Sequence, residues 1–348
     1  MGGTVVGVDI GGASIRAVEV QGYEGGKPSI VRYGEVPLPD SAVRRGEVVE
    51  VGTVGTAMKR LWATGGFKTK DVVLGMGGSR VFARDLQVPR GPMTQVRESL
   101  PFLVQDLLPI PVADAILDFY PLQEEQGESG PVLSGLLVAG VTEAITANVS
   151  SALAAGLNPV HVDLMPFAVT RALAPTRSAR GRDVLLDIGA YTTNLVVVDN
   201  GIPHFVRMIG AGGDDVTRAI ASKLQWAPEQ AEAAKRAIGM GGPMMRAEDR
   251  PVLEIIYEVV GEQLSNIRNT LSYYSSSKPN EPVQRILLTG GASQLVGLPK
   301  ALSEVTGLPV NPADALANVS VAKPKRAAER MDHTAYTAAF GLALGSHA

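Results

Sequence analysis

Runs of apolar residues divide the chain into short strands separated by helical stretches. Two runs rich in β-branched residues, 4–10 and 15–20, flank a small glycine-containing turn, which is the pattern of a hairpin. The spacing further predicts a strand at 29–35, an amphipathic helix at 52–63 and a buried strand at 71–75. This alternation of strands and helices predicts an α/β fold.

The pattern changes between residues 81 and 163. Strands are expected at 81–88, 115–122, 132–141 and 159–163, and helices at 93–108 and 143–155. The prolines at 109 and 111 would end the first of these helices, and the polar stretch 124–131 is typical of a loop. The β-α-β-β-α-β order predicts a compact insertion rather than a continuation of the first sheet.

The opening pattern returns at residues 183–198. In both stretches a strand ends in Asp-Ile-Gly, at Asp9 and at Asp187, and a second strand follows a short polar turn. This internal repeat predicts two structurally related halves. Beyond it we expect helices at 213–224, 228–238, 253–275 and 335–344, and a buried strand at 285–289.

Composition narrows the classes of protein. A length of 348 residues fits two domains or one large pseudo-symmetric domain, and 45% hydrophobic with 19% charged residues excludes disorder for most of the chain. The net charge of −3 argues against a dedicated nucleic-acid binder, and the absence of cysteine excludes disulfides and thiol chemistry. No signal peptide or run of about 18 apolar residues is visible, so we expect a cytoplasmic protein without direct membrane insertion.

Three glycine turns carry residues suited to a nucleotide. Glycine lets successive backbone N–H groups converge on a phosphate, and an Asp at a strand end can hold Mg²⁺ through water. Ser14, Thr192 and Thr193 add hydroxyl donors, and the small residues at 290–293 would admit a purine or a ribose. One such turn alone is equally well an ordinary glycine turn, whereas a matched pair indicates a shared site.

These motifs resemble those of the actin, sugar kinase and heat-shock chaperone ATPase superfamily. The resemblance implies an actin-like ATPase fold, which is a duplicated ribonuclease H-like fold, with an inserted α+β subdomain (1C) in the first half, and it implies ATP and Mg²⁺ as cofactors. The first half would span 1–180, with a core of 1–80 and 164–180 and the insertion at 81–163. The second half would span 181–334, with a core of 181–220 and 284–334 and a helical subdomain at 221–283. Residues 335–348 would form a C-terminal helix that returns to the first half.

The resemblance also implies roles for individual residues. Asp9 and Asp187 would hold Mg²⁺ through water, and Asp187 is a candidate catalytic residue. The stretch 231–235 is similar to the AE-x-x-K helix whose Glu and Lys contact ribose and base in relatives such as FtsA, although a solvated helix has the same pattern. The implied cofactor-binding residues are Asp9, Gly11, Gly12, Ala13, Ser14, Arg16, Asp187, Gly189, Thr192, Thr193, Asn194, Gly212, Gly213, Glu232, Lys235, Gly290, Gly291, Ala292 and Ser293.

Within the superfamily, the stretches 105–111, 118–120, 136–140 and 154–163 are similar to the PilM family of type IV pilus assembly proteins. This resemblance implies a scaffold at the inner face of the cytoplasmic membrane that docks the N-terminal cytoplasmic tail of a PilN-like inner-membrane protein and contacts other pilus components. An extended peptide would bind between the first-half core and the insertion, near 81–88 and the following helix. An FtsA-like cell-division scaffold and an ATPase or kinase with real turnover are the alternatives.

Two departures from the relatives bear on hydrolysis. Met165 stands where many relatives carry Glu, and a thioether cannot transfer a proton; Arg16 stands where many carry Lys. Asp163 is a tentative catalytic substitute if the strand is still extended there, or it caps a helix that begins near Pro166, and we favour the cap. We therefore expect weak or no ATP hydrolysis.

Overall fold

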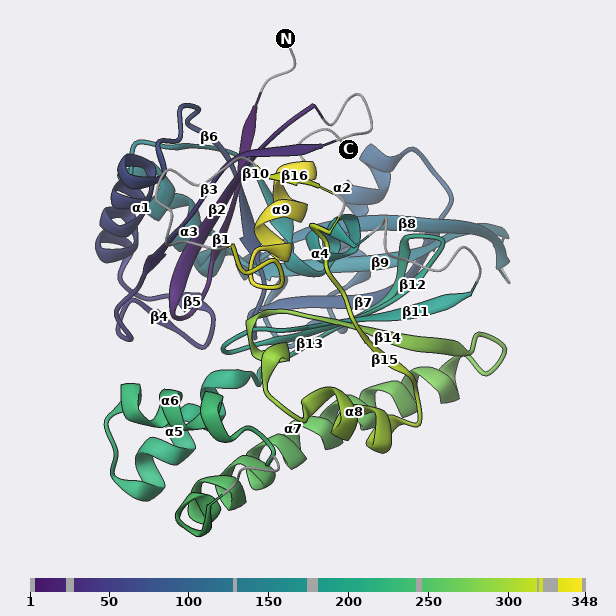
Figure 1. The fold of residues 1–348 in the computed structure, drawn as a ribbon. Coiled ribbons are helices and arrows are strands. Elements are labelled where there is room, and N and C mark those ends of the chain that lie inside the picture. Colours follow the sequence, from purple (N-terminus) through teal and green to yellow (C-terminus); the bar gives the residue numbers. More distant parts are fainter. Residues whose placement is uncertain are drawn as a thin grey trace.

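Two mixed β-sheets form the frame of the molecule (Figure 1). The computed structural model describes residues 4–22, 28–127, 130–173, 181–241, 246–317, 319–321 and 331–345. The first sheet has the strand order β10-β6-β1-β2-β3-β16 and the second has the order β13-β12-β11-β14-β15. In these orders the strands are β10 (Asn158–Leu164), β6 (Asp71–Met76), β1 (Val5–Ile10), β2 (Ser14–Gln21), β3 (Ser29–Pro37) and β16 (Ser320–Val321), then β13 (Ile202–Ile209), β12 (Thr193–Asp199), β11 (Arg182–Ile188), β14 (Val283–Thr289) and β15 (Val310–Pro312).

The two sheets repeat one topology. Strand β1 is antiparallel to β2 and parallel to β6, and β11 is antiparallel to β12 and parallel to β14. Asp9 lies opposite Arg16 in the first hairpin, and Asp187 lies opposite Asn194 in the second. The predicted pair of matching hairpins is confirmed, and each hairpin places its Asp one residue before the end of its first strand.

Helices fill three layers around the sheets. Helices α4 (Met165–Ala172) and α9 (Thr337–Leu344) lie between the two sheets, where apolar side chains of both sheets and both helices form one core. Helices α1 (Val51–Gly65) and α3 (Thr142–Ala154) pack on the other face of the first sheet. The outer face of the second sheet is covered by α5 (Gly213–Leu224), α6 (Pro228–Ile238), α7 (Arg250–Ser277) and α8 (Leu298–Thr306).

The insertion is a three-stranded antiparallel sheet with its own small core. Its strands follow the order β7-β9-β8, with β7 (Val81–Pro89), β8 (Ala115–Gly127) and β9 (Gly130–Val141), and α2 (Met93–Leu103) packs on it. The remaining elements are the short strands β4 (Val43–Arg44) and β5 (Glu47–Val48) and the 3-10 turns η2 (Val112–Asp114), η4 (Ala247–Asp249) and η5 (Gly291–Gln294).

Two local predictions in the insertion are wrong. Helix α2 ends at Leu103, five residues before the predicted end, because the backbone leaves the helical region at Val104, where φ is −115°. The polar stretch predicted as a loop at 124–131 instead continues strands β8 and β9 on both sides of residues 128 and 129. Cross-strand hydrogen bonds from Gln87 and Ser134 to the Glu125 carboxylate satisfy these polar side chains, so their composition does not break the sheet.

Strand β10 does not belong to the sheet of the insertion. We expected the last strand of the β-α-β-β-α-β stretch to complete that sheet, but β10 pairs in parallel with β6 of the first sheet. Parallel neighbours need a long crossover, and the whole insertion together with α3 serves as that crossover. The division into domains with the boundaries given above stays a prediction. Across the described ranges, none of the helices has the length and apolar character that crossing a membrane requires.

Two glycines let helix α9 approach its neighbours closely. A Cβ atom on Gly7 of β1 would lie 2.0 Å from the backbone oxygen of Ala339, and one on Gly341 would lie 1.9 Å from that of Ala168 in α4. Real Cβ atoms do not come so close to backbone oxygens, so a side chain at either position would push α9 out of the central layer.

We predict that Gly7→Ala lowers the free energy of unfolding by about 1–3 kcal/mol, the usual cost of overpacking a core. The matched control is Gly261→Ala within α7, where an added methyl group meets no atom within 4 Å. That control should gain roughly 0.5–1 kcal/mol because alanine favours the helix. Urea denaturation measures both, and equal effects of the two substitutions would contradict the packing of α9.

Candidate functional site

The two Asp-Ile-Gly hairpins end in turns of the same construction. The Gly11 backbone N–H donates a 3.0 Å hydrogen bond to the Ser14 carbonyl, and the Gly189 N–H donates one of 2.9 Å to the Thr192 carbonyl. Each turn is thus closed by a bond between its glycine and the residue three positions later. The repeat read from the sequence therefore extends to the hydrogen bonding of the turns.

The two turns touch each other where the halves meet. A Cβ atom on Gly12 would lie only 1.7 Å from Cε2 of Tyr191, so the tyrosine ring packs directly on the glycine. The Arg218 guanidinium lies 5.4 Å from the centre of the same ring, and its Nε is 3.0 Å from Asp214 Oδ2. Tyr191 is not among the predicted site residues, because its sequence neighbours carry no sign of its contact with Gly12.

Two buried carboxylates lie behind these turns. Asp9 is 8% exposed, and burial raises its pKa to about 6; Arg16 opposes the rise, whereas Asp187 and Glu35 add to it. Burial also raises the pKa of Asp187, against a 2.9 Å hydrogen bond from Asn194 Nδ2 and the charge of Arg16. Asp9 and Asp187 thus interact electrostatically across the junction, and a cation between them would relieve their repulsion.

Arg16 and Asn194 occupy equivalent places in the two hairpins and leave polar atoms unsatisfied. Arg16 Nη2 is 2.7 Å from Glu35 Oε1, and that oxygen also accepts a 2.6 Å hydrogen bond from Ser14 Oγ. Arg16 Nε and Asn194 Oδ1 are buried, and neither has a hydrogen-bond partner in the described structure. A buried unsatisfied group costs about 1–3 kcal/mol, so this donor and this acceptor favour a polar ligand between the turns.

The start of helix α5 is tied to the second turn. The backbone N–H groups of Gly213 and Asp214 donate to the carbonyls of Gly189 at 2.9 Å and Ala190 at 2.8 Å. A Cβ atom on Gly212 would come within 2.4 Å of the Ala190 oxygen, which explains the glycine before the helix. The positive end of the α5 dipole therefore lies beside the second turn, where it favours an anion.

The third glycine turn packs on the strand that carries Asp187. Gly290 has φ of +92°, and a Cβ atom there would lie 2.4 Å from the Ile188 oxygen and 2.5 Å from Asp187 Oδ1. Ser293 Oγ donates a 2.6 Å hydrogen bond to the Gly290 carbonyl. Only glycine fits this approach, so the third turn lies directly beside the second hairpin.

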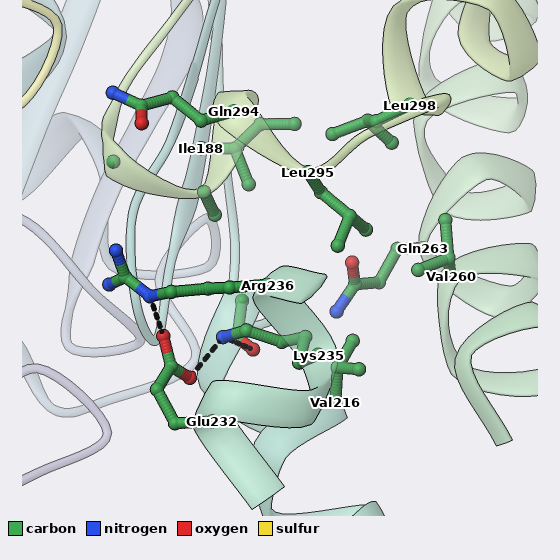
Figure 2. A pocket seen from close by; sticks show the side chains of 13 residues that line it. Ile188, Val216, Glu232, Lys235, Arg236, Val260, Gln263, Gln294, Leu295 and Leu298 are labelled. Carbon is green, nitrogen blue, oxygen red and sulfur yellow. Dashed lines mark hydrogen bonds and ion pairs between the residues drawn. The ribbon is translucent and has the colours of Figure 1, made fainter. Parts of the chain in front are cut away.

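A pocket of about 190 Å³ opens between the third turn and helices α5, α6 and α7 (Figure 2). Apolar side chains and charged or amide side chains share its wall, a mixture that small-molecule sites use to bind and orient a ligand. The lining residues are Ile188, Gly213, Val216, Glu232, Lys235, Arg236, Val260, Gln263, Gly291, Ala292, Gln294, Leu295 and Leu298.

Glu232 and Lys235 belong to a hydrogen-bonded network at the polar side of this pocket. Lys235 Nζ is 2.5 Å from Glu232 Oε2 and donates to Thr217 Oγ1 at 2.9 Å and to the Gly213 carbonyl at 3.1 Å. Burial raises the pKa of Glu232, but hydrogen bonds from Lys235, Thr217 and Arg236 outweigh it and hold the pKa below its usual value. The Lys235 side chain is only 12% exposed, which excludes a freely solvated helix face.

Of the remaining predicted residues, Ala13 is an exposed turn residue and Thr193 Oγ1 donates to the Ala211 carbonyl at 2.8 Å. Asp163 does not cap a helix. Helix α4 has no side-chain cap, and the Asp163 carboxylate instead pairs with Arg171, whose Nε donates to the Gly341 carbonyl at 3.2 Å. The cap prediction is wrong because the helix begins directly after Leu164, and the carboxylate turns toward Arg171, about two helical turns further on.

Met165 packs against the core, and its side chain offers no polar group to a ligand. A Cβ atom on Gly75 of β6 would lie 2.4 Å from the Met165 sulfur, so the thioether fills the space above that glycine. Within the described ranges, no three His, Asp or Glu side chains gather closely enough to hold a metal directly. A cation at the junction would therefore rest on Asp9 and Asp187 with water completing its coordination.

We predict that Gly12→Ala lowers the free energy of unfolding by about 1–3 kcal/mol, since its methyl group would overlap the Tyr191 ring. When Tyr191 is replaced by alanine, the clash no longer exists. Adding Gly12→Ala to Tyr191→Ala should therefore lower the free energy of unfolding much less than Gly12→Ala does in the wild type. Chemical denaturation of the four proteins gives the coupling energy. A coupling energy near zero would show that the two turns do not touch in solution.

The raised pKa of Asp9 predicts a pH dependence. The Asp9 carboxyl group binds its proton more tightly in the folded state than in the unfolded chain, where its pKa is near 3.8. Protonation of Asp9 therefore stabilises the folded state; this stabilisation is complete below pH 4 and is lost as the pH rises through about 6. The loss is at most about 3 kcal/mol at neutral pH. Asp9→Asn should flatten the fall in the free energy of unfolding between pH 4 and 7, and an unchanged slope would place the titration elsewhere.

Both a family model and a solved structure are similar to nearly the whole chain. The family model described as "Type IV pilus assembly protein PilM" matches residues 7–347. A chain of the solved PilM-PilN type IV pilus biogenesis complex is 26% identical, with a TM-score of 0.84 over 98% of this chain and 97% of that one.

More distant matches share the fold. Cell division protein FtsA of Neisseria meningitidis serogroup B is 22% identical over 341 residues, which cover 87% of this chain and 82% of FtsA. MreB 5 of Spiroplasma citri, solved with AMPPNP, has a TM-score of 0.52 at 14% identity over 91% of this chain and 93% of that one. Together these matches confirm the predicted actin-like ATPase fold.

Proposed function

The chain belongs to the PilM family of type IV pilus assembly proteins, and we propose that it is an ATP-binding, actin-like scaffold that docks the cytoplasmic tail of a PilN-like inner-membrane protein. The observation that carries the nucleotide site is the convergence of three glycine turns and two strand-end carboxylates at the junction of the halves. Family membership carries the role in pilus assembly. FtsA-like proteins match at lower identity, so the cell-division alternative has weaker support.

The pocket beside η5 would receive the base and ribose. Glu232 and Lys235 lie at its polar side, and Gly291 and Ala292 of the third turn line it, so these groups would orient the nucleoside. Their mutual hydrogen bonds fix both side chains before any ligand arrives, which lowers the entropy cost of binding. The pocket lies next to Gly213 and therefore leads toward the second turn.

The phosphates would lie between the two hairpin turns. The backbone N–H groups of Gly12 and Ala13 in the first turn and of Thr192 in the second would donate to them, whereas those of Gly11 and Gly189 close their own turns. The unpartnered Arg16 Nε adds a further donor. Mg²⁺, when bound, would neutralise phosphate charge. Asp9 and Asp187 fit it through water, because both carboxylates are destabilised by burial and Asn194 Oδ1 offers an acceptor for a bound water.

We expect this site to retain ATP and to hydrolyse it slowly, if at all. Asp187 lies at the candidate phosphate site, but Asp163 is neutralised by Arg171 and Met165 has no group that could deprotonate water. Both observations support turnover well below about 1 s⁻¹, the low end of ordinary enzymes.

Docking of a PilN-like tail rests on the family and on the match to the PilM-PilN complex. The tail would bind between the first-half core and the insertion, near β7 and α2, as an extended peptide. Such docking would bring the protein to the inner face of the cytoplasmic membrane through its partner, together with other components of the pilus machinery.

The test is calorimetric titration with ATP–Mg²⁺ and then with a synthetic PilN-like tail peptide. We predict one ATP bound per chain and at least tenfold weaker binding to Asp187→Asn, which equals about 1.4 kcal/mol. The matched control is Asp199→Asn at the far end of the same hairpin, where Asp199 pairs with Arg182 at 3.1 Å; its affinity should stay within twofold of wild type.

Equal affinity of Asp187→Asn and the wild type would show that the nucleotide site is misplaced. For the peptide, saturable binding that a scrambled sequence lacks is expected. Identical weak binding of both peptides would contradict the docking role while leaving the nucleotide site standing.

A further inference from the structure

A small hairpin connects the second glycine turn to the base of the insertion. We propose that Glu47 on this hairpin is a positioning residue that couples occupancy of the nucleotide site to the orientation of the insertion. This inference rests on the proposed nucleotide site and adds to it a route by which bound ATP would act on the part of the chain near which the partner tail is expected to dock.

The hairpin is formed by β4 and β5 and has a tight two-residue tip. Val43 pairs with Val48 and Arg44 with Glu47, and the two loop residues Arg45 and Gly46 have φ of 52° and 82°. Positive φ at both loop positions is the signature of the type I′ turn, whose twist matches that of its strands. This turn sets the position of the tip relative to the residue that follows it, Glu47.

This tip lies close to the second glycine turn. A Cβ atom on Gly46 would lie 3.6 Å from Thr192 Cγ2, and one on Gly78, in the loop after β6, would lie 3.9 Å from the same methyl group. The Thr192 methyl group thus lies beside two first-half loops. A shift of the second turn on binding phosphate would press on the hairpin or release it.

Glu47 links the hairpin to the base of the insertion through Arg80 and Ser79. Its Oε2 is 2.8 Å from Arg80 Nε, and its Oε1 accepts a 2.9 Å hydrogen bond from Ser79 Oγ. Arg80 Nη1 is also 3.0 Å from Glu143 Oε2 in the first turn of α3. The Glu47 side chain is 22% exposed and that of Arg80 is 43% exposed, so water reaches this ion pair and screens it in part.

Arg80 stands where the chain enters and leaves the insertion. It directly precedes β7, and its backbone carbonyl accepts a 3.0 Å hydrogen bond from the N–H of Val141, the last residue of β9. Glu143 follows two residues later. The carboxylate of Glu47 and the guanidinium of Arg80 therefore join the hairpin to both chain connections of the insertion.

The insertion also contacts the second half. Strand β7 lies beside β13, and Asp85 Oδ2 of β7 is 3.8 Å from Lys278 Nζ at the end of α7. A sheet held on one side by the first half and on the other by the second changes its tilt when the halves move relative to each other. Coupling free energies are reciprocal. If bound ATP changes the affinity of the insertion for a partner by some factor, the bound partner changes the affinity for ATP by that same factor.

The experiment measures the tilt directly. The chain has no cysteine, so Lys59→Cys on α1 and Glu98→Cys on α2 provide two exposed, unique sites for nitroxide labels. Pulsed electron paramagnetic resonance then gives the distance between core and insertion with and without ATP–Mg²⁺, and calorimetry on the same labelled protein gives its ATP affinity. We expect ATP–Mg²⁺ to shift the distance distribution of the otherwise wild-type protein.

Glu47→Gln should abolish this shift while its ATP affinity stays within twofold of wild type, because the amide keeps the size of the side chain but loses the ion pair with Arg80. The matched control is Glu50→Gln, which makes the same change two residues after β5 at a carboxylate bonded to Thr53 Oγ1 at 2.7 Å; it should keep the shift.

Persistence of the full shift in Glu47→Gln would overturn the proposal, and so would bound ATP without any shift in the wild type. Failure of the labelled wild type to bind ATP would instead overturn the proposed nucleotide site, and the coupling with it.

Discussion

The structure depends on a pair of like charges held out of water. Asp9 and Asp187 lie one residue before the ends of equivalent strands of the two sheets, and both carboxylates are destabilised by burial where the halves meet. A chain gains nothing in stability from such a pair, because each desolvated carboxylate costs free energy that Arg16 and Asn194 offset only in part. The arrangement suits a site that binds a cation and an anion together, because Arg16 Nε and Asn194 Oδ1 are a donor and an acceptor without partners there.

The central helices set the geometry of that pair. Helices α4 and α9 separate the two sheets, and glycines at positions 7 and 341 allow α9 to pack almost against the backbone of its neighbours. This spacing brings the two turns into contact through Gly12 and Tyr191. The close approach of Gly290 to Asp187 then adds the third turn, so a site assembled from distant segments of the chain needs little adjustment to receive a ligand.

The sequence predicts local features well and long-range ones poorly. The repeated hairpins, the helices at 213–224 and 228–238 and the glycine turns follow from short patterns and are present in the structure. The pairing of β10 with β6, the ion pair of Asp163 with Arg171 and the contacts of Tyr191 and Glu47 join residues through the tertiary fold, and no local pattern encodes them. The loop predicted at 124–131 is wrong because cross-strand hydrogen bonds outweigh the polar composition of this stretch.

The central claim is that three separate turns form one nucleotide site, and hydrogen–deuterium exchange tests it most directly. On addition of ATP–Mg²⁺, the backbone amides of 11–14, 189–193 and 290–293 should slow together and with the same dependence on ATP concentration, because a single ligand orders all three. Protection of only one of these segments, or of none while ATP is bound, would contradict the shared site.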